Sequence, residues 1–513
     1  MKVSRRRFIV STALVGGGVL IGYSATRPSR HSRANNELAK GSERFITSFI
    51  KIDKENEITI FVPHSEMGQG IHTALSMMAA DELDASWEDI KIEQAPAIDL
   101  FANGDLIKGF AGEFGVPDAL MPLVNMSAFP IAEIMNLQIT GGSSSVRYTG
   151  ETAMRTAGAA ARKMLLEAAA NRLSVPIDEL TTELSHVNHN ASGQSMSYGQ
   201  LATDAALLEP PENPILKDRS QFNIMGKAIS RNDIPAKVDG SAMFGIDAHS
   251  DDMLFAAIKL APVFGTKLTS VDATEALTLR GVKRVIELED SFAVVADSYW
   301  RAKNALALVD ATFEASENDS ISSSDIDARF SKELAENNGS KDKEVGDAEA
   351  ELEAAADVLE ANYRVPYLAH AAMEPMNCTV HFKGDAAEVW TSTQDALGTA
   401  GRVATVAGLP ESKVTFHQTY CGGGFGRRVP LLNSNVIDHA TLIAMEFDVP
   451  VKTIFSREDD MQQDHYRPAV HNNFKAAFDV NNNVTAWHSR FTGPISVPGA
   501  SHIPYAIENQ SIR

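Results

Sequence analysis

A glycine-rich loop with two arginines is the segment whose residue types could most directly hold an anionic ligand. Gly422–Arg428 reads GGGFGRR, follows a strand-like pattern over 413–421 and precedes a helical pattern. Consecutive glycines permit positive φ and bring backbone N–H groups close to a ligand, and the arginines would add forked donors. A tight surface turn explains the loop alone equally well. It matches neither the GxGxxG nor the Walker A pattern.

Two glutamines carry amides that can donate and accept hydrogen bonds at the same time. Gln69 stands between Gly68 and Gly70, just before apolar residues at helical spacing over 71–83. Gln394 ends a strand-like run. Each amide could hold a polar ligand, and the alternatives are a strand-to-helix turn for the first and a surface amide for the second.

A polar loop precedes a second expected helix. Gly141–Arg147 contains Ser143, Ser144 and Ser145, and apolar spacing predicts a helix over 151–171. One face of that helix carries Ala157, Gly158 and Ala161, so we expect another element to approach its backbone closely.

Histidines and cysteines give no metal-ligand pattern. His64, His72 and His370 belong to no HExxH motif or facial triad, so we expect no metal held by protein ligands alone, and we interpret Glu374 as a structural carboxylate. The only cysteines are Cys378 and Cys421. A cysteine-ligated iron–sulfur cluster normally needs four thiolates, so any such cluster must lie on another chain. We expect Cys421 to be a buried, unreactive thiol.

The elements that position these residues fall into five parts. The composition of the whole chain, 44% hydrophobic and 22% charged, is that of a globular protein. The parts are a signal and polar linker (1–42), a first α/β block (43–225), a small α+β module with strands near 254–260, 282–288 and 292–296 and helices near 270–279 and 299–310 (226–314), an acidic connector with one short helix (315–354), and a last α/β block that we interpret as truncated (355–513).

Charge and the N-terminus bear on partners and location. The net charge of −21 and the lack of a basic stripe predict no nucleic-acid partner. Ser4–Phe8 reads SRRRF and leads into a short apolar run, which resembles a twin-arginine signal for export of folded protein to the periplasm. The alternatives are an ordinary secretory signal and an uncleaved membrane anchor.

Taken together, the motifs resemble one family, the molybdenum-cofactor-binding large subunits of the xanthine oxidase family. Within it they resemble the isoquinoline 1-oxidoreductase beta-subunit and membrane-bound aldehyde dehydrogenase type. The resemblance rests on five motifs in consistent order: Met67–Thr73, Met373–Pro375, Thr391–Gln394, Gly422–Arg428, and Ser456–Met461 with Tyr466–Pro468.

The resemblance implies a multidomain α+β fold with α/β cofactor-binding domains and an α/β hammerhead domain at 226–314. It implies a molybdopterin dinucleotide, commonly the cytosine form, carrying molybdenum, and a hydroxylation in which water supplies the oxygen. Gln394 would contact the apical oxo group as the catalytic residue of this chain. The implied cofactor-binding residues are Gly68, Gln69, Gly70, Ser143, Ser144, Ser145, Gln394, Gly423, Gly424, Phe425, Gly426 and Arg427.

Two departures from the family pattern bear on the general base of the reaction and on the class of substrate. The Gly-x-Gly-Glu segment that carries the family's general-base glutamate does not occur, and Val429 stands where purine-oxidising relatives have a glutamate. We therefore expect an N-heteroaromatic or aldehyde substrate. A small two-iron two-sulfur subunit would receive the electrons, followed in aldehyde-oxidising relatives by a cytochrome c.

Two other functions remain as alternatives. One is a non-catalytic exported binding protein that retains the fold. The other is a nucleotide-dependent dehydrogenase that uses the glycine loop for phosphate.

Overall fold

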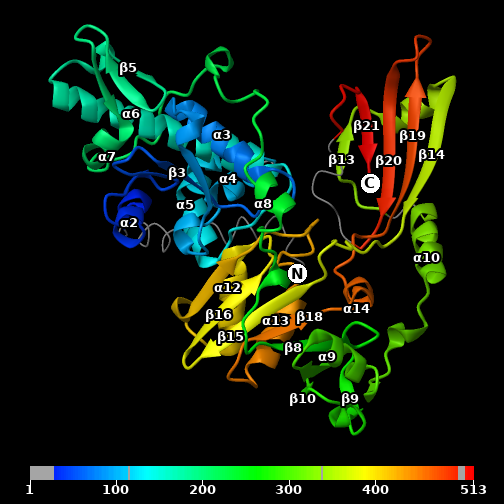
Figure 1. Cartoon of the computed structure of the whole chain (residues 1–513). Coiled ribbons are helices and arrows are strands. Elements are labelled where there is room, and N and C mark those ends of the chain that lie inside the picture. The colour runs from blue at the N-terminus through cyan, green and yellow to red at the C-terminus, as the bar shows by residue number, and fades with distance from the viewer. Residues whose placement is uncertain (1–27, 114–115, 337–338, 495–502) are drawn as a thin grey trace.

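The structure is a computed structural model that describes residues 28–113, 116–336, 339–494 and 503–513. Its mixed helices and sheets confirm the expected multidomain α+β class. In Figure 1 the N-terminal region, in blue and cyan, and the five-stranded sheet near the C-terminus rise as two arms above a seven-stranded sheet. The expected export signal lies outside the described residues. Within those residues, no helix combines the length and apolarity needed to cross a bilayer.

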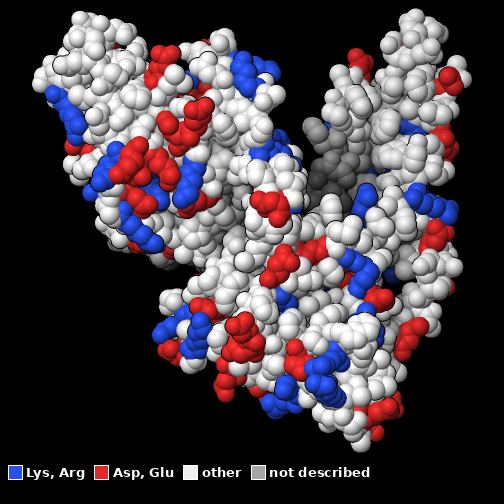
Figure 2. Space-filling view, viewed as in Figure 1, with Lys and Arg blue, Asp and Glu red and all other residues white. Residues whose placement is uncertain are grey.

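The two arms are well separated. Figure 2 shows an open gap between them, and acidic and basic side chains are interspersed over the face drawn.

The N-terminal region packs helices against a four-stranded sheet of order β1-β2-β3-β4. The isoleucines that alternate between residues 50 and 62 form the expected hairpin-like strands and are buried. The expected helix over 71–83 is confirmed as α3, which crosses over between the parallel strands β3 and β4. The elements are β1 (Arg44–Thr47), β2 (Ile50–Ile52), β3 (Ile58–Val62), α3 (Ile71–Leu83) and β4 (Ile90–Gln94).

Helix α6 (Arg155–Leu173) packs closely on α3. A Cβ atom on Gly158 would lie 2.3 Å from the carbonyl oxygen of Ala79, so the element that approaches the small-residue face is α3. A π-helical segment, Ser145–Met154, leads directly into α6. The loop expected at Ser143–Ser145 is therefore the start of a helical segment.

The expected polar linker contains a helix instead. Helix α2 (Arg30–Glu37) starts at the N-cap Ser29, Arg33 pairs with Asp99 at 2.7 Å, and the His31 ring bonds the carbonyl of Phe45 at 2.8 Å. Polar tertiary contacts hold this helix, so the linker predicted from the polar composition of these residues was wrong. The remaining elements of the region are α4 (Gly104–Glu113), α5 (Met121–Ile134), β5 (Leu180–Glu183), β6 (His186–His189), β7 (Gln194–Ser197) and α7 (Tyr198–Ala205).

Strands from two of the expected domains share one seven-stranded sheet of order β10-β11-β8-β18-β15-β16-β17. β8 (Leu254–Leu260), from the expected hammerhead module, pairs in parallel with β18 (Val451–Ile454), from the last block. Backbone hydrogen bonds therefore cross the boundary that composition suggested, and the module is not a separate sheet. The other strands are β10 (Val282–Glu287), β11 (Ser291–Ala296), β15 (Asn377–Lys383), β16 (Ala386–Thr391) and β17 (Val414–Gln418).

The prediction of a helix over 270–279 was wrong. β9 (Leu268–Asp272) occupies its first part and pairs with β12 (Asp310–Phe313), which leaves only a short 3₁₀ turn at Ala276–Thr278. Strand pairing across the module overrides the local helical spacing. The helices around the seven-stranded sheet are α8 (Ile234–Asp239), α9 (Tyr299–Leu306), α12 (Ala396–Ala407), α13 (Asn435–Ala444) and α14 (Arg457–Gln462).

The expected acidic connector is a packed part of the five-stranded sheet. It carries two helices and a strand, whose buried contacts include Phe330 and Ala348. The sequence did not indicate this packing, because apolar residues are sparse in the segment and only one side chain of each helix is buried. The elements, with the sheet order β13-β21-β20-β19-β14, are α10 (Ser323–Ala335), β13 (Lys343–Val345), α11 (Ala348–Ala354), β14 (Asp357–Val365), β19 (Val470–Phe478), β20 (Val484–Thr492) and β21 (Asn509–Ile512).

Candidate cofactor site

The glycine loop that follows β17 is held at both ends by side chains from other segments. The N–H of Gly422 donates to Glu374 Oε2 at 2.9 Å, and the N–H of Gly426 donates to Gln394 Oε1 at 2.9 Å. These bonds fix where the loop begins and ends.

Between these anchors, three successive backbone N–H groups are free. The N–H groups of Gly423, Gly424 and Phe425 make no hydrogen bond within the described part of the chain. Gly423, Phe425 and Gly426 have φ of +103°, +57° and +104°. Free N–H groups on a backbone with positive φ form a concavity that binds anions or oxygen atoms. The sequence predicted this property of the loop.

Gln394 joins this loop to the N-terminal region. Its Oε1 accepts from Gly426, and its Nε2 donates to the carbonyl oxygen of Thr140 at 3.0 Å. In return, the N–H of Thr140 donates to the carbonyl of Gln394 at 2.6 Å. Gln394 is 4% exposed, so the alternative of a surface amide is wrong. One N–H of its amide group remains for a ligand. Thr140 was not predicted as a site residue, and its position directly before Gly141 was its only signal in the sequence.

The Met-Gly-Gln-Gly segment lies directly against the glycine loop. A Cβ atom on Gly424 would lie 2.5 Å from Gln394 Oε1 and 2.7 Å from Met67 Sδ. A larger residue at this position would force these two side chains to move. Three of the motifs identified in the sequence therefore meet at one point, although Met67 and Gly424 are more than 300 residues apart along the chain.

Gln69 lies on an exposed turn before α3. Its Oε1 accepts from the N–H of Met67 at 2.6 Å, and its Nε2 donates to the carbonyl of Ser65 at 3.0 Å. The amide thus closes its own turn, and one N–H remains. Gly68 has a φ of +97° and open space where a side chain would be, so its backbone is accessible to a ligand. Glu66 precedes this turn and accepts hydrogen bonds from its N–H groups, and it was not predicted as a site residue.

The serines of the polar loop differ in accessibility. Ser144 donates to the carbonyl of Gly141, and Ser145 accepts from the N–H of Gly141 at 3.2 Å. Both are buried, whereas Ser143 is exposed. Of the three hydroxyl groups, only that of Ser143 is therefore presented to solvent.

The two arginines of the loop point into the protein. Arg427 is 1% exposed and lies 2.8 Å from Asp464 and 3.3 Å from Asp460. Burial lowers the pKa of Arg427 and raises that of Asp460. Arg428 bonds backbone carbonyls, including that of Glu374. We expected these guanidinium groups to face a ligand, and the structure corrects this, because the two buried carboxylates draw Arg427 inward.

Glu374 is a structural carboxylate, as the sequence predicted. Besides Gly422, it accepts hydrogen bonds from Ile246, Asn377 and Ser392 at 2.9–3.0 Å. It thereby joins the glycine loop to the segment that precedes β8.

Two buried thiols and a buried imidazole lie near the site. Burial raises the pKa of Cys421 to about 11 and that of Cys378 to about 12. Burial, with a contribution from His72, lowers the pKa of His64 to about 3, so this imidazole is neutral. Nowhere in the described ranges do three or more His, Cys, Asp or Glu side chains gather as metal ligands.

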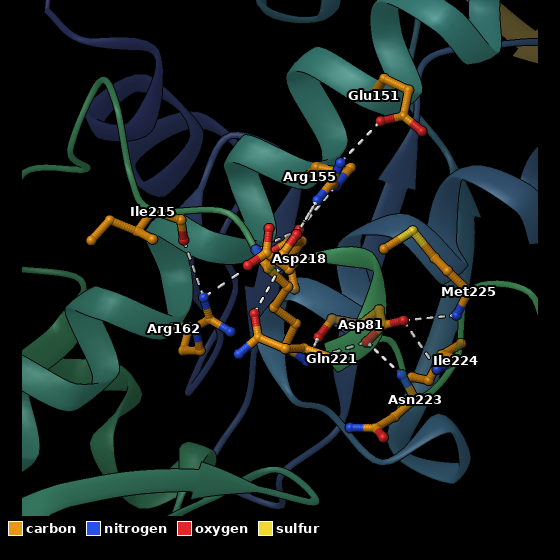
Figure 3. A network of polar contacts seen from close by, with 12 residues as sticks. Asp81, Glu151, Arg155, Arg162, Ile215, Asp218, Gln221, Asn223, Ile224 and Met225 are labelled. Carbon is orange, nitrogen blue, oxygen red and sulfur yellow. Dashed lines mark hydrogen bonds and ion pairs between the residues drawn. The ribbon is translucent and has the colours of Figure 1, made fainter.

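A polar network fastens the far end of α3 (Figure 3). Asp81 accepts from the N–H groups of Asn223, Ile224 and Met225 at 3.1, 3.0 and 2.7 Å. Burial alone would raise the pKa of Asp81, but these bonds and Lys217 hold it below its ordinary value. The helix that begins at the Gly68–Gly70 turn is thus tied to the segment leading into the next region.

The site suits a ligand with several oxygen atoms. It offers the neutral N–H groups of Gly423, Gly424 and Phe425 and the remaining amide N–H of Gln394, beside the accessible backbone of Gly68. Neutral donors in fixed positions stabilise oxo or phosphate oxygens, whereas a bare cation would need carboxylate or thiolate ligands. The residues therefore fit an oxo-bearing molybdenum cofactor.

Domain matches to known families also indicate a molybdenum cofactor. Two models of the molybdopterin cofactor-binding domain match the chain, over residues 9–105 and 330–502. The chain belongs to the molybdenum-cofactor-binding subunits of the xanthine oxidase family. The resemblance based on the five sequence motifs is thereby confirmed, and the second domain match includes the Gly422–Arg428 loop.

Two curated relatives are similar over most of the chain. Isoquinoline 1-oxidoreductase subunit beta of Brevundimonas diminuta is 28% identical over 92% of this chain and 61% of the relative. Membrane-bound aldehyde dehydrogenase (pyrroloquinoline-quinone) of Gluconacetobacter polyoxogenes is 30% identical over 94% of this chain and 59% of the relative. The chain thus spans about three fifths of the length of these relatives. Among solved structures, aldehyde oxidoreductase from Desulfovibrio gigas aligns with a TM-score of 0.45 and 15% identity over 87% of this chain and 55% of that chain.

Proposed function

We propose that the chain binds the molybdenum cofactor of a hydroxylase that oxidises an N-heteroaromatic compound or an aldehyde. The observation that carries this proposal is the meeting of Met67, Gln394 and Gly424 beside the three free N–H groups of the glycine loop. The names of the two curated relatives, an isoquinoline oxidoreductase and an aldehyde dehydrogenase, support the choice of substrate class.

When bound, the cofactor supplies the redox centre, and water is the proposed source of the oxygen that enters the product. The N–H groups of Gly423, Gly424 and Phe425 would hold its oxygen atoms. Gln394 would orient them through its remaining N–H, and the exposed turn of Gly68 and Gln69 would contact the pterin. We further propose a molybdopterin cytosine dinucleotide, with the exposed Ser143 as a contact to its phosphates.

The electrons would leave through another protein. The chain contains two cysteines, both of which are buried and free. Because an iron–sulfur cluster normally needs four thiolates, we propose a small two-iron two-sulfur partner subunit, with a cytochrome c as a subsequent acceptor. We also propose export to the periplasm through the twin-arginine motif at Ser4–Phe8.

The deciding experiment is elemental analysis of the protein complex isolated from its native host. About one molybdenum per protomer, with reduction of an artificial dye by isoquinoline-type compounds or aldehydes, is the expected result. A well-folded complex without molybdenum would refute the proposal. Bound molybdenum without oxidation of either substrate class would favour the non-catalytic binding protein.

A further inference from the structure

The turn that carries Gly68 and Gln69 surrounds the buried carboxylate of Glu66. Glu66 Oε1 accepts hydrogen bonds from the N–H groups of Gly68 at 2.9 Å and Gly70 at 3.0 Å. Its Oε2 accepts from the N–H of His72 at 3.3 Å, in the first turn of α3. The side chain of Glu66 has no exposed surface. Glu66 therefore occupies the position at the N-terminus of α3 that a bound anion would otherwise take.

Cations from a distant segment neutralise this carboxylate. Arg231 Nη2 lies 3.2 Å from Glu66 Oε1, and Lys237 Nζ lies 3.9 Å from it. Asp233, also buried, holds both cations, with Arg231 Nε at 2.9 Å and Lys237 Nζ at 2.5 Å. Burial alone would raise the pKa of Asp233, but the two cations lower it far below its ordinary value. The four charges form a closed cluster at the junction where α8 lies in Figure 1.

Arg231 also holds the outside of the turn. Its Nη1 donates to the carbonyl oxygen of Gly68 at 2.7 Å, and its side chain lies 3.5 Å from where a Cβ atom of Gly70 would be. Glu66 thus binds the N–H groups of the turn from inside while Arg231 binds a carbonyl from outside. A turn held on both sides keeps the positive φ of Gly68 and its open face.

Glu66 also sets the spacing between the two loops of the site. Its backbone carbonyl accepts from the N–H of Cys421 at 3.1 Å, immediately before the glycine loop. One residue therefore fixes the Gly68–Gly70 turn through its side chain and the glycine loop through its backbone.

We propose that Glu66, neutralised by Arg231 and Lys237, is the positioning residue of the cofactor site. It holds the Gly68–Gln69 turn in its observed conformation beside the glycine loop. The inference rests on the proposed function for the identity of the ligand. The hydrogen bonds of the turn itself do not depend on the proposed function.

The test compares Glu66→Gln with wild type by two measurements. The first is amide hydrogen exchange of a peptide that spans residues 66–72, in the cofactor-free chain. Glutamine keeps a single acceptor oxygen, so its NH₂ group would face either the N–H of His72 or the N–H groups of Gly68 and Gly70 together with Arg231. We therefore expect exchange about tenfold faster or more, as for the loss of a hydrogen bond to a charged group. The second is the molybdenum content of the native complex, which we expect to fall.

Two further variants separate positioning from folding. Glu57→Gln makes the same chemical change on a half-exposed side chain of the same region and should match wild type in both measurements. Arg231→Lys keeps the charge but loses the fork that reaches Gly68, Glu66 and Asp233 together. Because Arg231 is one-third exposed, this variant should fold and show a smaller increase in exchange with a partial loss of molybdenum.

Each outcome decides a separate point. Unchanged exchange in both Glu66→Gln and Arg231→Lys would overturn the inference. Faster exchange with unchanged molybdenum would show that the turn does not position the cofactor, and would overturn it as well. A wild-type complex without molybdenum would refute the proposed function, while the exchange measurement would still decide whether Glu66 holds the turn.

Discussion

The side-chain oxygen of Gln394 accepts a hydrogen bond from the N–H of Gly426 at 2.9 Å. This bond joins the segment after β16 to the glycine loop after β17, and the amide nitrogen of the same side chain reaches Thr140 in the N-terminal region. Gln394 therefore holds together the two halves of the candidate site before any cofactor binds.

Replacing Gln394 by alanine should destabilise the protein by about 2 kcal/mol, because buried partners in both regions lose their hydrogen bonds. Urea unfolding of the cofactor-free chain would measure the change. Gln194→Ala, at an exposed position of β7, should remain within about 0.5 kcal/mol of wild type. Equal effects of the two variants would contradict the bridging role of Gln394.

Alanine at Gly68 should disturb the site without disturbing the core. Gly68 and Gly408, the C-cap of α12, both have positive φ and open space where a Cβ atom would be. Each alanine should cost about 1 kcal/mol through backbone strain. Only Gly68→Ala should also lower molybdenum content, measured by elemental analysis of the native complex. A loss of molybdenum in Gly408→Ala of the same size would show that the effect is not local.

Stability should fall as pH rises because of Asp395, next to Gln394. Burial raises the pKa of Asp395 to about 7, against an ordinary value of 3.8. Between these values the folded protein holds a proton that the unfolded chain has lost. The free energy of unfolding therefore decreases as pH rises from about 4 to about 7, by roughly 4 kcal/mol from this group.

Asp395→Asn should remove that dependence. Its side-chain oxygen can still accept from Gly398 and Gln138, the two N–H groups that the carboxylate binds. Denaturant unfolding at several pH values should show the variant more stable than wild type at pH 8 and similar near pH 4. Asp310→Asn, at an exposed position, should retain the wild-type profile. A wild-type profile in Asp395→Asn would exclude this carboxyl as the cause.

The network in Figure 3 offers a contrast between a buried and an exposed carboxylate. Asp81 Oδ2 accepts from the N–H groups of Ile224 and Met225, and Oδ1 accepts from the N–H of Asn223 and from the buried Lys217. Asp81→Asn leaves one of these two sets without its acceptor and should destabilise the protein by about 3 kcal/mol. Glu151→Gln breaks a 3.0 Å pair to Arg155 on a half-exposed side chain and should cost less than about 1 kcal/mol. Urea unfolding measures both, and comparable losses would contradict this ranking.

Local patterns in the sequence were sufficient for some elements and misleading for others. Apolar spacing predicted α3 and β8 with their observed bounds, because buried apolar side chains recur along each element at its own period. Polar composition suggested a linker at α2 and a connector with one short helix at 315–354, where the structure has two helices. These helices are held by ion pairs and by few buried side chains. Apolar spacing also placed a helix at β9, where pairing with β12 decides the structure.

The sequence by itself determined the family, the glycines that let a ligand reach the backbone, and the structural role of Glu374. Each of these depends on residue types within a short segment. Only the tertiary structure decided that Arg427 turns inward to Asp464, that β8 and β18 share a sheet, and that Glu66 binds the turn of Gly68. These relationships join residues whose partners lie far along the chain or depend on the backbone path of a turn. They arise because buried charges and backbone N–H groups must find partners wherever the fold provides them.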